Sequence, residues 1–471
     1  MVSWANAGVR DLHLDLTEAI TPGMRGAREK LLTALRDAVR SGRLAPGTML
    51  PPSRSLAVDL GLARNTVAEA YAGLVAEGWL ASRQGAGTWV VNAGTEVSVR
   101  PRGTRVVPTH NLMPGSPDVA QFPRNEWVAS TRRALSAAPT EALRMGDPRG
   151  RQELRDALAA YLARARGVRT SAESIVICAG VRHGVEILTR VFRGDRPIAV
   201  EAYGLFIFRD AIAAMGMATT PVGVDERGAV VADLDALAVP AVLLTPAHHS
   251  PFGMPLHSTR RTAVVDWAQR TDGYVLDDDY DGELRYDRQP VGALQGLSPD
   301  RVVYLGSASK SLSPALRLGW MALPSDLVEP VIAAAGGSQF YVDAISQLTM
   351  ADFITSGGYD KHIRRMRLRY RRRRDALVEA LRPFALTVSG LNAGLNLLLT
   401  LPDGTEPEVL RRAGGAGIAL EGLSIMRHPH AGADVPRPDG VIVGFGTPAE
   451  HAFPAAVRAL CDVLESSGLR R

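Results

Sequence analysis

The sequence feature that most constrains the fold is the apolar run Val302–Leu305, which is followed directly by the residues GSASKSLSPALR. Four apolar residues in a row suit one buried strand of a sheet. The residues after the run supply serine hydroxyls, one lysine and one arginine. The Lys310 amine can form an imine with an aldehyde. Because Ser307, Ser309 and Arg317 can bind phosphate oxygens, the stretch suits a phosphorylated aldehyde.

A second apolar run, about thirty residues upstream, ends in carboxylates and a tyrosine: Val275-Leu-Asp-Asp-Asp-Tyr280. A site for pyridoxal phosphate (PLP) needs a carboxylate at the pyridinium nitrogen as well as a Schiff-base lysine. The alternative is a surface loop with an ordinary lysine. The two stretches together favour a PLP site over that alternative.

Length and composition set wider bounds. A chain of 471 residues predicts two or more domains, and 46% hydrophobic with 22% charged residues is ordinary for a globular protein. The sequence has no apolar run long enough to cross a bilayer, and residues 1–10 lack the order of a signal peptide. We therefore expect a cytoplasmic protein without a membrane partner. Cys178 and Cys461 show no metal-ligand spacing, and the net charge of +5 permits nucleic-acid binding without arguing for it.

The N-terminal stretch, residues 12–92, predicts a winged helix-turn-helix of the α+β class. Its apolar spacing and glycine stops indicate helices over 26–41, 53–60 and 64–77, then a hairpin over 79–91 with a glycine-rich tip. A three-helix cap without a DNA role is the alternative. Arg64, Asn65 and Thr66 stand at the start of the third helix, where a recognition helix meets DNA, so we predict binding to double-stranded DNA.

After a linker over residues 93–110, helices and apolar strands alternate over 111–468, which predicts a large doubly wound α/β domain. One turn in this domain suggests phosphate binding. Gly180 follows an apolar strand and opens a helix, where free backbone N–H groups and the helix dipole attract anions. The backbone amides of Val181 and Arg182 are the candidates.

The chain resembles fold-type I aminotransferases, and more closely the MocR/GabR-type transcriptional regulators. The large domain has the pattern D-D-Y followed by S-x-S-K-x-x-x-P-x-x-R-x-G, and the N-terminus matches the GntR signature in order at 50–57, 62–67 and 78–88. The resemblance implies a fold-type I PLP-dependent transferase-like domain, a homodimer, and DNA contacts by Arg54, Arg64, Asn65, Thr66, Gln84, Gly85, Gly87 and Thr88. Ala63 departs from the GntR pattern, since a helix-capping or phosphate-binding hydroxyl is missing there.

The resemblance also assigns cofactor roles. It implies that Lys310 forms the Schiff base with PLP and that Tyr280 holds the phenolic oxygen. Aminotransferases place the pyridine-binding Asp three residues before the tyrosine, which is Asp277, and the regulators place it two before, which is Asp278; we favour Asp278. Tyr203 corresponds to the tyrosine that stacks on the pyridine ring, and its alternative is an ordinary loop aromatic.

Three positions depart from working aminotransferases, and a fourth departs from regulators that sense an amino acid. Met145 replaces a tyrosine that reaches the neighbouring subunit's phosphate, and Ser250 replaces an asparagine at the phenolic oxygen. Ile442 stands at the position of the substrate arginine of aminotransferases. Leu205 stands where a regulator that senses an amino acid has a second carboxylate-binding arginine. An apolar side chain cannot offset the desolvation of a carboxylate, so amino-acid transamination is disfavoured unless Arg427 or another arginine substitutes.

Two further patterns have simpler interpretations. The pair His248-His249 has no third ligand at useful spacing, so we predict no metal. Residues 362–374 contain eight arginines, which suggests either a second DNA surface or a solvated or dimer-facing helix. We favour the second interpretation, because arginine stems readily cover apolar surface.

These observations predict a PLP-dependent transcriptional regulator that binds PLP on Lys310 and senses PLP itself, an amine or an amino acid. The alternative is a working aminotransferase with an appended DNA-binding domain. A DNA-binding protein with an inert second domain is a third possibility, and the presence of Lys310 and its partners argues against it.

Overall fold

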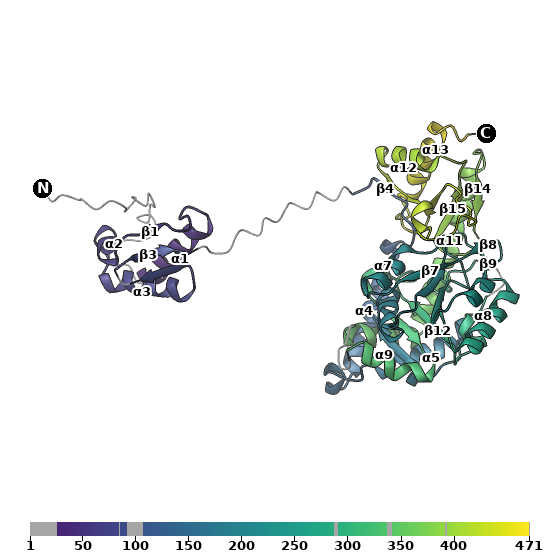
Figure 1. The fold of residues 1–471 in the computed structure, drawn as a ribbon, viewed down its shortest axis with the longest axis horizontal. Helices are drawn as coiled ribbons and strands as arrows, with labels where there is room; N and C mark the ends of the chain where they lie inside the picture. Colours follow the sequence, from purple (N-terminus) through teal and green to yellow (C-terminus); the bar gives the residue numbers. More distant parts are fainter. Residues whose placement is uncertain are drawn as a thin grey trace. The chain divides into compact units, whose positions relative to one another are not determined.

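The computed structural model describes residues 26–83, 85–91, 107–286, 291–336, 342–390 and 393–470. The chain divides into two compact units, Met1–Val106 and Val107–Arg471 (Figure 1). Among the described residues, none of the helices is long and apolar enough to cross a membrane.

The small unit is a winged helix-turn-helix. Its elements are α1 (Ala27–Arg40), β1 (Met49–Leu50), α2 (Ser53–Asp59), α3 (Arg64–Ala76), β2 (Leu80–Arg83) and β3 (Gly87–Val90). The strands pair antiparallel in the order β1-β3-β2, with Arg83 opposite Gly87 at the hairpin tip. Leu31 and Leu35 of α1 pack with Val67 and Leu74 of α3 in one core, which confirms the predicted fold of this unit.

Helix α3 begins without a side-chain cap. Ala63 occupies the N-cap position with extended backbone angles, and no side chain accepts a hydrogen bond from the first turn there. The position that lacks the GntR-type hydroxyl is therefore the N-cap of α3, where a hydroxyl would accept a hydrogen bond from the first turn.

The large unit is built on a seven-stranded sheet in the order β5-β13-β12-β11-β10-β6-β7. Strand β13 runs antiparallel to its two neighbours, and the other pairs are parallel. The strands are β5 (Ile175–Cys178), β6 (Ile198–Glu201), β7 (Thr219–Val222), β10 (Ala241–Leu244), β11 (Tyr274–Asp278), β12 (Val302–Ser307) and β13 (Gly319–Ala322). The carboxyl ends of the parallel strands therefore meet at one edge of the sheet, where ligands bind in open α/β folds.

Helices cover both faces of this sheet (Figure 1). Along β12, Tyr304 packs into the core beside α5 and α10, whereas Val303 and Leu305 pack into the core beside α6, α7 and α9. Alternate residues of a buried strand thus meet two helical layers, as a doubly wound fold requires. The helices are α4 (Arg124–Ala137), α5 (Gln152–Arg166), α6 (Val181–Val191), α7 (Phe206–Ala214), α8 (Ser258–Thr271), α9 (Val328–Ala334), α10 (Ala344–Thr355), α11 (Gly358–Leu381), α12 (Glu406–Gly415) and α13 (Phe453–Ser466).

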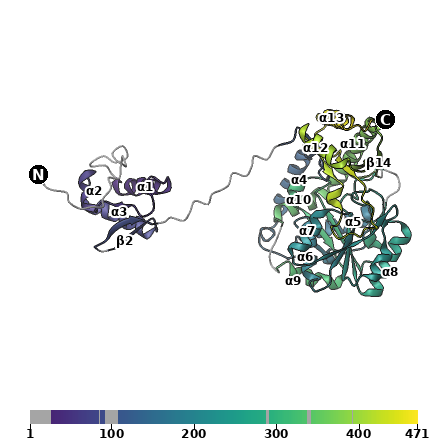
Figure 2. The same cartoon turned by 45° about the horizontal axis from the view of Figure 1, so that its top comes forward.

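A smaller antiparallel sheet in the order β14-β15-β18-β17 forms the C-terminal part. Its strands are β14 (Thr387–Ser389), β15 (Asn396–Thr400), β17 (Glu421–Gly422) and β18 (Gly440–Gly444); the short pairs β4 (His110–Asn111) with β16 (Ile418–Ala419), and β8 (Val224–Asp225) with β9 (Gly228–Ala229), complete the strands. Helices α12 and α13 lie with β14 at one end of the unit in both views (Figure 2).

The arginine-rich helix α11 is partly an internal element. The Arg373 side chain is 3% exposed and pairs with Asp118 at 2.8 Å and Glu450 at 2.7 Å. Arg367 donates a hydrogen bond to the carbonyl of Glu283. These two arginines bind other parts of the large unit. Arg364, Arg365, Arg371 and Arg372 are exposed, as expected for a solvated or dimer-facing side of the helix.

Candidate functional site

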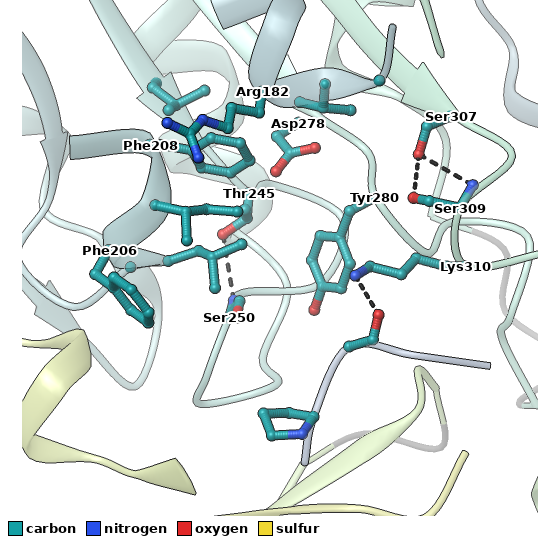
Figure 3. Close-up of a pocket in the computed structure, with 18 of the residues that line it drawn as sticks. Arg182, Phe206, Phe208, Thr245, Ser250, Asp278, Tyr280, Ser307, Ser309 and Lys310 are labelled. Atoms are coloured by element: carbon teal, nitrogen blue, oxygen red, sulfur yellow. Dashed lines mark hydrogen bonds between the residues drawn. The ribbon is translucent and has the colours of Figure 1, made fainter. Parts of the chain in front are cut away.

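Polar residues from four strands meet at the carboxyl edge of the large sheet, and two of them, Asp278 and Ser307, were predicted from the sequence. Glu201 ends β6, Thr245 follows β10, Asp278 ends β11 and Ser307 ends β12. All four line one cavity of about 400 Å³. Figure 3 shows Thr245, Asp278 and Ser307 among its lining residues. The cavity forms because these parallel strands end at the same edge, so residues far apart in sequence face a common space.

Lys310 lines this cavity from the loop after β12, and its side chain extends toward Tyr280 (Figure 3). The Lys310 ammonium donates a hydrogen bond to the carbonyl of Gly115. Burial lowers the pKa of Lys310, and the carboxylates of Asp278 and Asp281 oppose that shift. A lower pKa leaves more of the amine unprotonated, which is the form that attacks a carbonyl carbon.

The structure separates the two candidate carboxylates. Asp277 accepts hydrogen bonds from the backbone amides of Leu294 and Gln295 at 2.7 and 3.2 Å, outside the cavity. Asp278 lines the cavity, and its buried Oδ1 has no hydrogen-bond partner among the described residues. Neighbours along a strand point to opposite faces, so only one of the pair can serve a ligand. This geometry supports Asp278.

Burial disfavours the ionised form of Asp278. It raises the pKa of the carboxyl well above its usual range, and the nearby carboxylates of Asp279, Asp277 and Asp281 raise it further, while the Lys310 ammonium lowers it. A cationic N–H group in the cavity would satisfy the unpartnered oxygen and stabilise the ionised form.

Tyr280 lines the same cavity, and its hydroxyl lies 3.1 Å from Nδ1 of His248. That nitrogen also lies 2.7 Å from Oδ2 of Asp281. Burial is the main cause that raises the pKa of Tyr280 well above its usual value, so the phenol stays protonated. It can donate a hydrogen bond to a ligand oxygen. The described residues contain no group of three potential ligands that could hold a metal ion.

One end of the cavity gathers groups that can bind a phosphate. Helix α6 begins after Gly180, whose φ is 91°, and the amides of its first turn have no carbonyl partner within the helix. The hydroxyls of Ser307 and Ser309 lie 2.6 Å apart. A Cβ on Gly180 would lie 3.6 Å from the guanidinium of Arg317, which makes no hydrogen bond or ion pair with any residue that the structure describes. Helix amides, two hydroxyls and a free arginine therefore converge here.

Tyr203 is not brought to this cavity. Its hydroxyl donates to the carbonyl of Pro436 at 2.8 Å, and its ring contacts Phe252 at a centroid distance of 5.1 Å. The apolar lining after β6 comes instead from Leu205, Phe206, Ile207 and Phe208, of which Phe206 and Phe208 are labelled in Figure 3. The geometry does not support the expected stacking role of Tyr203, because its ring is held by contacts with the C-terminal part.

Several residues that line the cavity are not among those predicted from the sequence. Glu201 accepts a hydrogen bond from the Thr245 hydroxyl at 2.7 Å, and burial raises the pKa of Glu201 to about 8. Asn396, Glu421 and Ile442 form a wall contributed by the C-terminal sheet. No local motif marks these positions. Of the departures noted above, Ser250, Leu205 and Ile442 line the cavity, and Met145 is 69% exposed elsewhere.

The predicted DNA-contacting residues lie at the start of α3, on α2 and at the hairpin tip. The side chains of Arg54, Arg64 and Asn65 are exposed and make no hydrogen bond or ion pair within the described part of the chain. Thr66 is half-buried. Gly85 and Gly87 have φ of 84° and 89°, as a tight tip requires, and Thr88 Oγ1 lies 3.3 Å from Ser82 Oγ. Gln84 lies outside the described residues.

The donor set in the large cavity fits PLP. An amine, an unpartnered buried carboxylate, a phenol and a group of phosphate donors surround one space of suitable size. Each corresponds to one reactive or polar part of the cofactor: the aldehyde, the ring nitrogen, the phenolic oxygen and the phosphate.

Comparisons with known proteins give matches to both units. Residues 27–90 match the family model of bacterial regulatory proteins, gntR family, and residues 111–422 match aminotransferase class I and II. The HTH-type pyridoxine biosynthesis transcriptional regulator PdxR of Corynebacterium glutamicum is 32% identical over 446 residues, covering 92% of this chain and 95% of that protein. The probable rhizopine catabolism regulatory protein MocR of Rhizobium meliloti is 29% identical over 470 residues, covering 93% and 94%.

Solved structures resemble the large unit. Kynurenine aminotransferase of Pyrococcus horikoshii superimposes with a TM-score of 0.68 at 24% identity, covering 77% of this chain and 92% of that one. This likeness shows a fold-type I aminotransferase fold, as the sequence predicted.

Proposed function

The chain belongs to the MocR-type subfamily of GntR transcriptional regulators, and on that premise we propose that its aminotransferase-like unit binds PLP on Lys310 and controls DNA binding by the winged helix. The observation that carries the proposal is the convergence of Lys310, Asp278 and the phosphate donors on one cavity. In a chain of three lysines, the one lysine in this cavity lies beside the carboxylates that such a site needs.

PLP, when bound, supplies an aldehyde carbon that a primary amine can attack and a ring nitrogen that withdraws electrons. The residues of this chain hold and orient it. Asp278 pairs with the ring N–H, and Tyr280 donates to the phenolic oxygen. The amides of Val181 and Arg182, the hydroxyls of Ser307 and Ser309, and the guanidinium of Arg317 bind the phosphate.

The regulatory step requires that a ligand change the DNA-binding state. We propose a homodimer in which occupancy of the cavity biases the arrangement of two winged helices, and so the spacing of the DNA half-sites they can bind. PLP itself and a further amine are both candidate signals. The Corynebacterium relative is named as a regulator of pyridoxine biosynthesis, which supports PLP as one of them.

Similarity along the chain favours a regulator over an aminotransferase with an appended DNA-binding domain. The two regulators cover 92% and 93% of this chain. By contrast, the aromatic-amino-acid aminotransferase of Thermococcus litoralis covers 68%.

The visible absorption spectrum of the full-length protein tests the cofactor assignment. We expect an imine band after addition of PLP, and borohydride should then fix the cofactor to Lys310. Because Lys30 and Lys361 are the other lysines in the chain, peptide mapping has only three possible sites.

Lys310→Ala should lose the band, and Lys361→Ala, a change at an exposed position on α11, should keep it. A band that survives in Lys310→Ala, or fixation at another lysine, would overturn the assignment. Fluorescence anisotropy with DNA from the region upstream of the gene, with and without PLP, tests the link to DNA binding.

A further inference from the structure

One wall of the cavity comes from the C-terminal sheet, and it carries an acid. Glu421 of β17 lies opposite Ile442 of β18, and Leu398 of β15 lies opposite the same Ile442. Residues directly opposite one another in antiparallel strands share a face. Glu421 therefore stands on the same face as these two apolar side chains, and it lines the cavity beside Asn396.

The Glu421 carboxylate has no partner in the part of the chain that the structure describes. No hydrogen bond or ion pair involves its side chain. Burial raises the pKa of Glu421, and no neighbouring cation acts against that shift. A half-buried carboxylate without a counter-charge is an unfavourable arrangement that a bound cation would relieve.

The basic side chains of the cavity are engaged elsewhere. Arg182 pairs with Glu186 at 3.1 Å. Arg209 donates to the backbone carbonyls of Gly204, Ile425 and Met426. Lys310 and Arg317 belong to the cofactor end described above. The wall that holds Glu421 is thus acidic and apolar.

We propose that Glu421 binds the positively charged far end of an effector amine, so that the regulator responds to a primary amine carrying a second cationic group, such as a short diamine. The near nitrogen of this ligand faces Lys310, and in that respect the inference rests on the proposed function. An ω-amino acid of the same length would place its carboxylate beside Glu421, where like charges repel.

Three ligands of equal carbon count test the far end alone: 1,4-diaminobutane, butylamine and 4-aminobutanoate. Isothermal titration calorimetry of the full-length protein, loaded with PLP and free of it, measures each affinity. We expect the diamine to bind most tightly and 4-aminobutanoate most weakly. Glu421→Gln should weaken diamine binding about 10- to 100-fold, the range for loss of a charged hydrogen bond, and leave butylamine nearly unchanged.

Glu329→Gln, at an exposed position on α9, is the matched control and should change none of the affinities. Ile442→Arg would place a cation opposite Glu421 and should reverse the order of the diamine and 4-aminobutanoate. This second variant keeps the test decisive if Glu421→Gln folds poorly.

The inference is overturned if 4-aminobutanoate binds wild type as tightly as the diamine, or if Glu421→Gln binds the diamine like wild type. Failure of the proposed function looks different, because the imine band would then be absent from wild type. The titrations of PLP-free protein still report the Glu421 contact in that case.

Discussion

The two units both present polar groups that lack partners within the protein, but they do so in opposite environments. At the start of α3, Arg64 and Asn65 are exposed and water can hydrate them. At the end of β11, Asp278 is 3% exposed and one of its oxygens has no partner among the described residues. Hydrated groups cost the folded state little, whereas a buried unpartnered group costs stability until a ligand arrives. The first surface suits a large charged partner, and the second suits a small molecule.

The residues that hold the two sites in place also differ. Asp278 is followed by Asp279, which forms a two-bond ion pair with Arg166 at 2.6 and 2.8 Å and accepts a third hydrogen bond from Tyr304. Arg64, by contrast, stands on a helix whose buried face packs in an apolar core. That face consists of Val67, Ala70, Tyr71 and Leu74. The buried site is therefore supported by a network of ion pairs and hydrogen bonds, whereas the exposed site on α3 is supported by apolar packing.

The largest expected effect is loss of that network. Arg166→Met leaves the Asp279 carboxylate buried without its counter-charge, and we expect a loss of about 3–5 kcal/mol in the free energy of unfolding of the large unit. Arg133→Ala, which breaks the more exposed pair with Asp352, should cost far less, because solvent screens exposed ion pairs. Pulse proteolysis in urea measures both. If both variants lost the same free energy of unfolding, a buried ion pair would matter no more to stability than an exposed one, contrary to the expectation.

At the exposed site, a substitution should weaken DNA binding without changing stability. Arg64→Ala should weaken DNA binding about 10- to 100-fold, because one contact to a base or phosphate is lost. Its free energy of unfolding should stay within about 0.5 kcal/mol of wild type. Arg28→Ala, on α1 of the same unit and outside the predicted contact set, is the control for nonspecific charge loss. An Arg64→Ala protein that binds DNA normally would show that α3 does not read DNA as expected.

A pH titration should detect the buried acids of the cavity. Burial raises the pKa of Glu201 to about 8, and an unfolded glutamate titrates near about 4.3. Between these values the folded protein keeps a proton that the unfolded chain has released, so the free energy of unfolding falls as pH rises.

We expect Glu201 to contribute a fall of about 2 kcal/mol between about pH 6 and pH 8 in PLP-free protein. Urea unfolding of wild type and Glu201→Gln at several pH values isolates this contribution. Parallel pH profiles for the two proteins would contradict it.

The smallest effect concerns the uncapped start of α3. Ala63→Ser restores a side-chain oxygen at the N-cap, and we expect a gain of about 0.5–1 kcal/mol in the stability of the small unit. Ala68→Ser, at an exposed position inside the same helix, should give no gain. Thermal unfolding followed by circular dichroism compares the two. If Ala68→Ser stabilises the unit as much, capping is not the cause.

Some site residues could be placed from the sequence and others could not, for physical reasons. Lys310 and Asp278 could be placed together because Asp278 ends one short apolar strand and Lys310 lies in the loop just after another, and parallel strands of a doubly wound sheet end at one edge. Tyr203 could not be placed, because its side-chain direction depends on contacts with Pro436 and Phe252 that no local pattern encodes.

The sequence by itself determined the two units, their fold classes and the strand-end positions of the polar residues, since periodicity and short motifs are local properties of the chain. Only the tertiary structure decided which neighbour of an adjacent pair faces the cavity, as with Asp277 and Asp278. It alone brought Glu421 to the cavity wall, because that position depends on strand pairing between β17 and β18. Long-range packing has no signature in a single segment of sequence, and so the far wall of the site became visible only in the folded molecule.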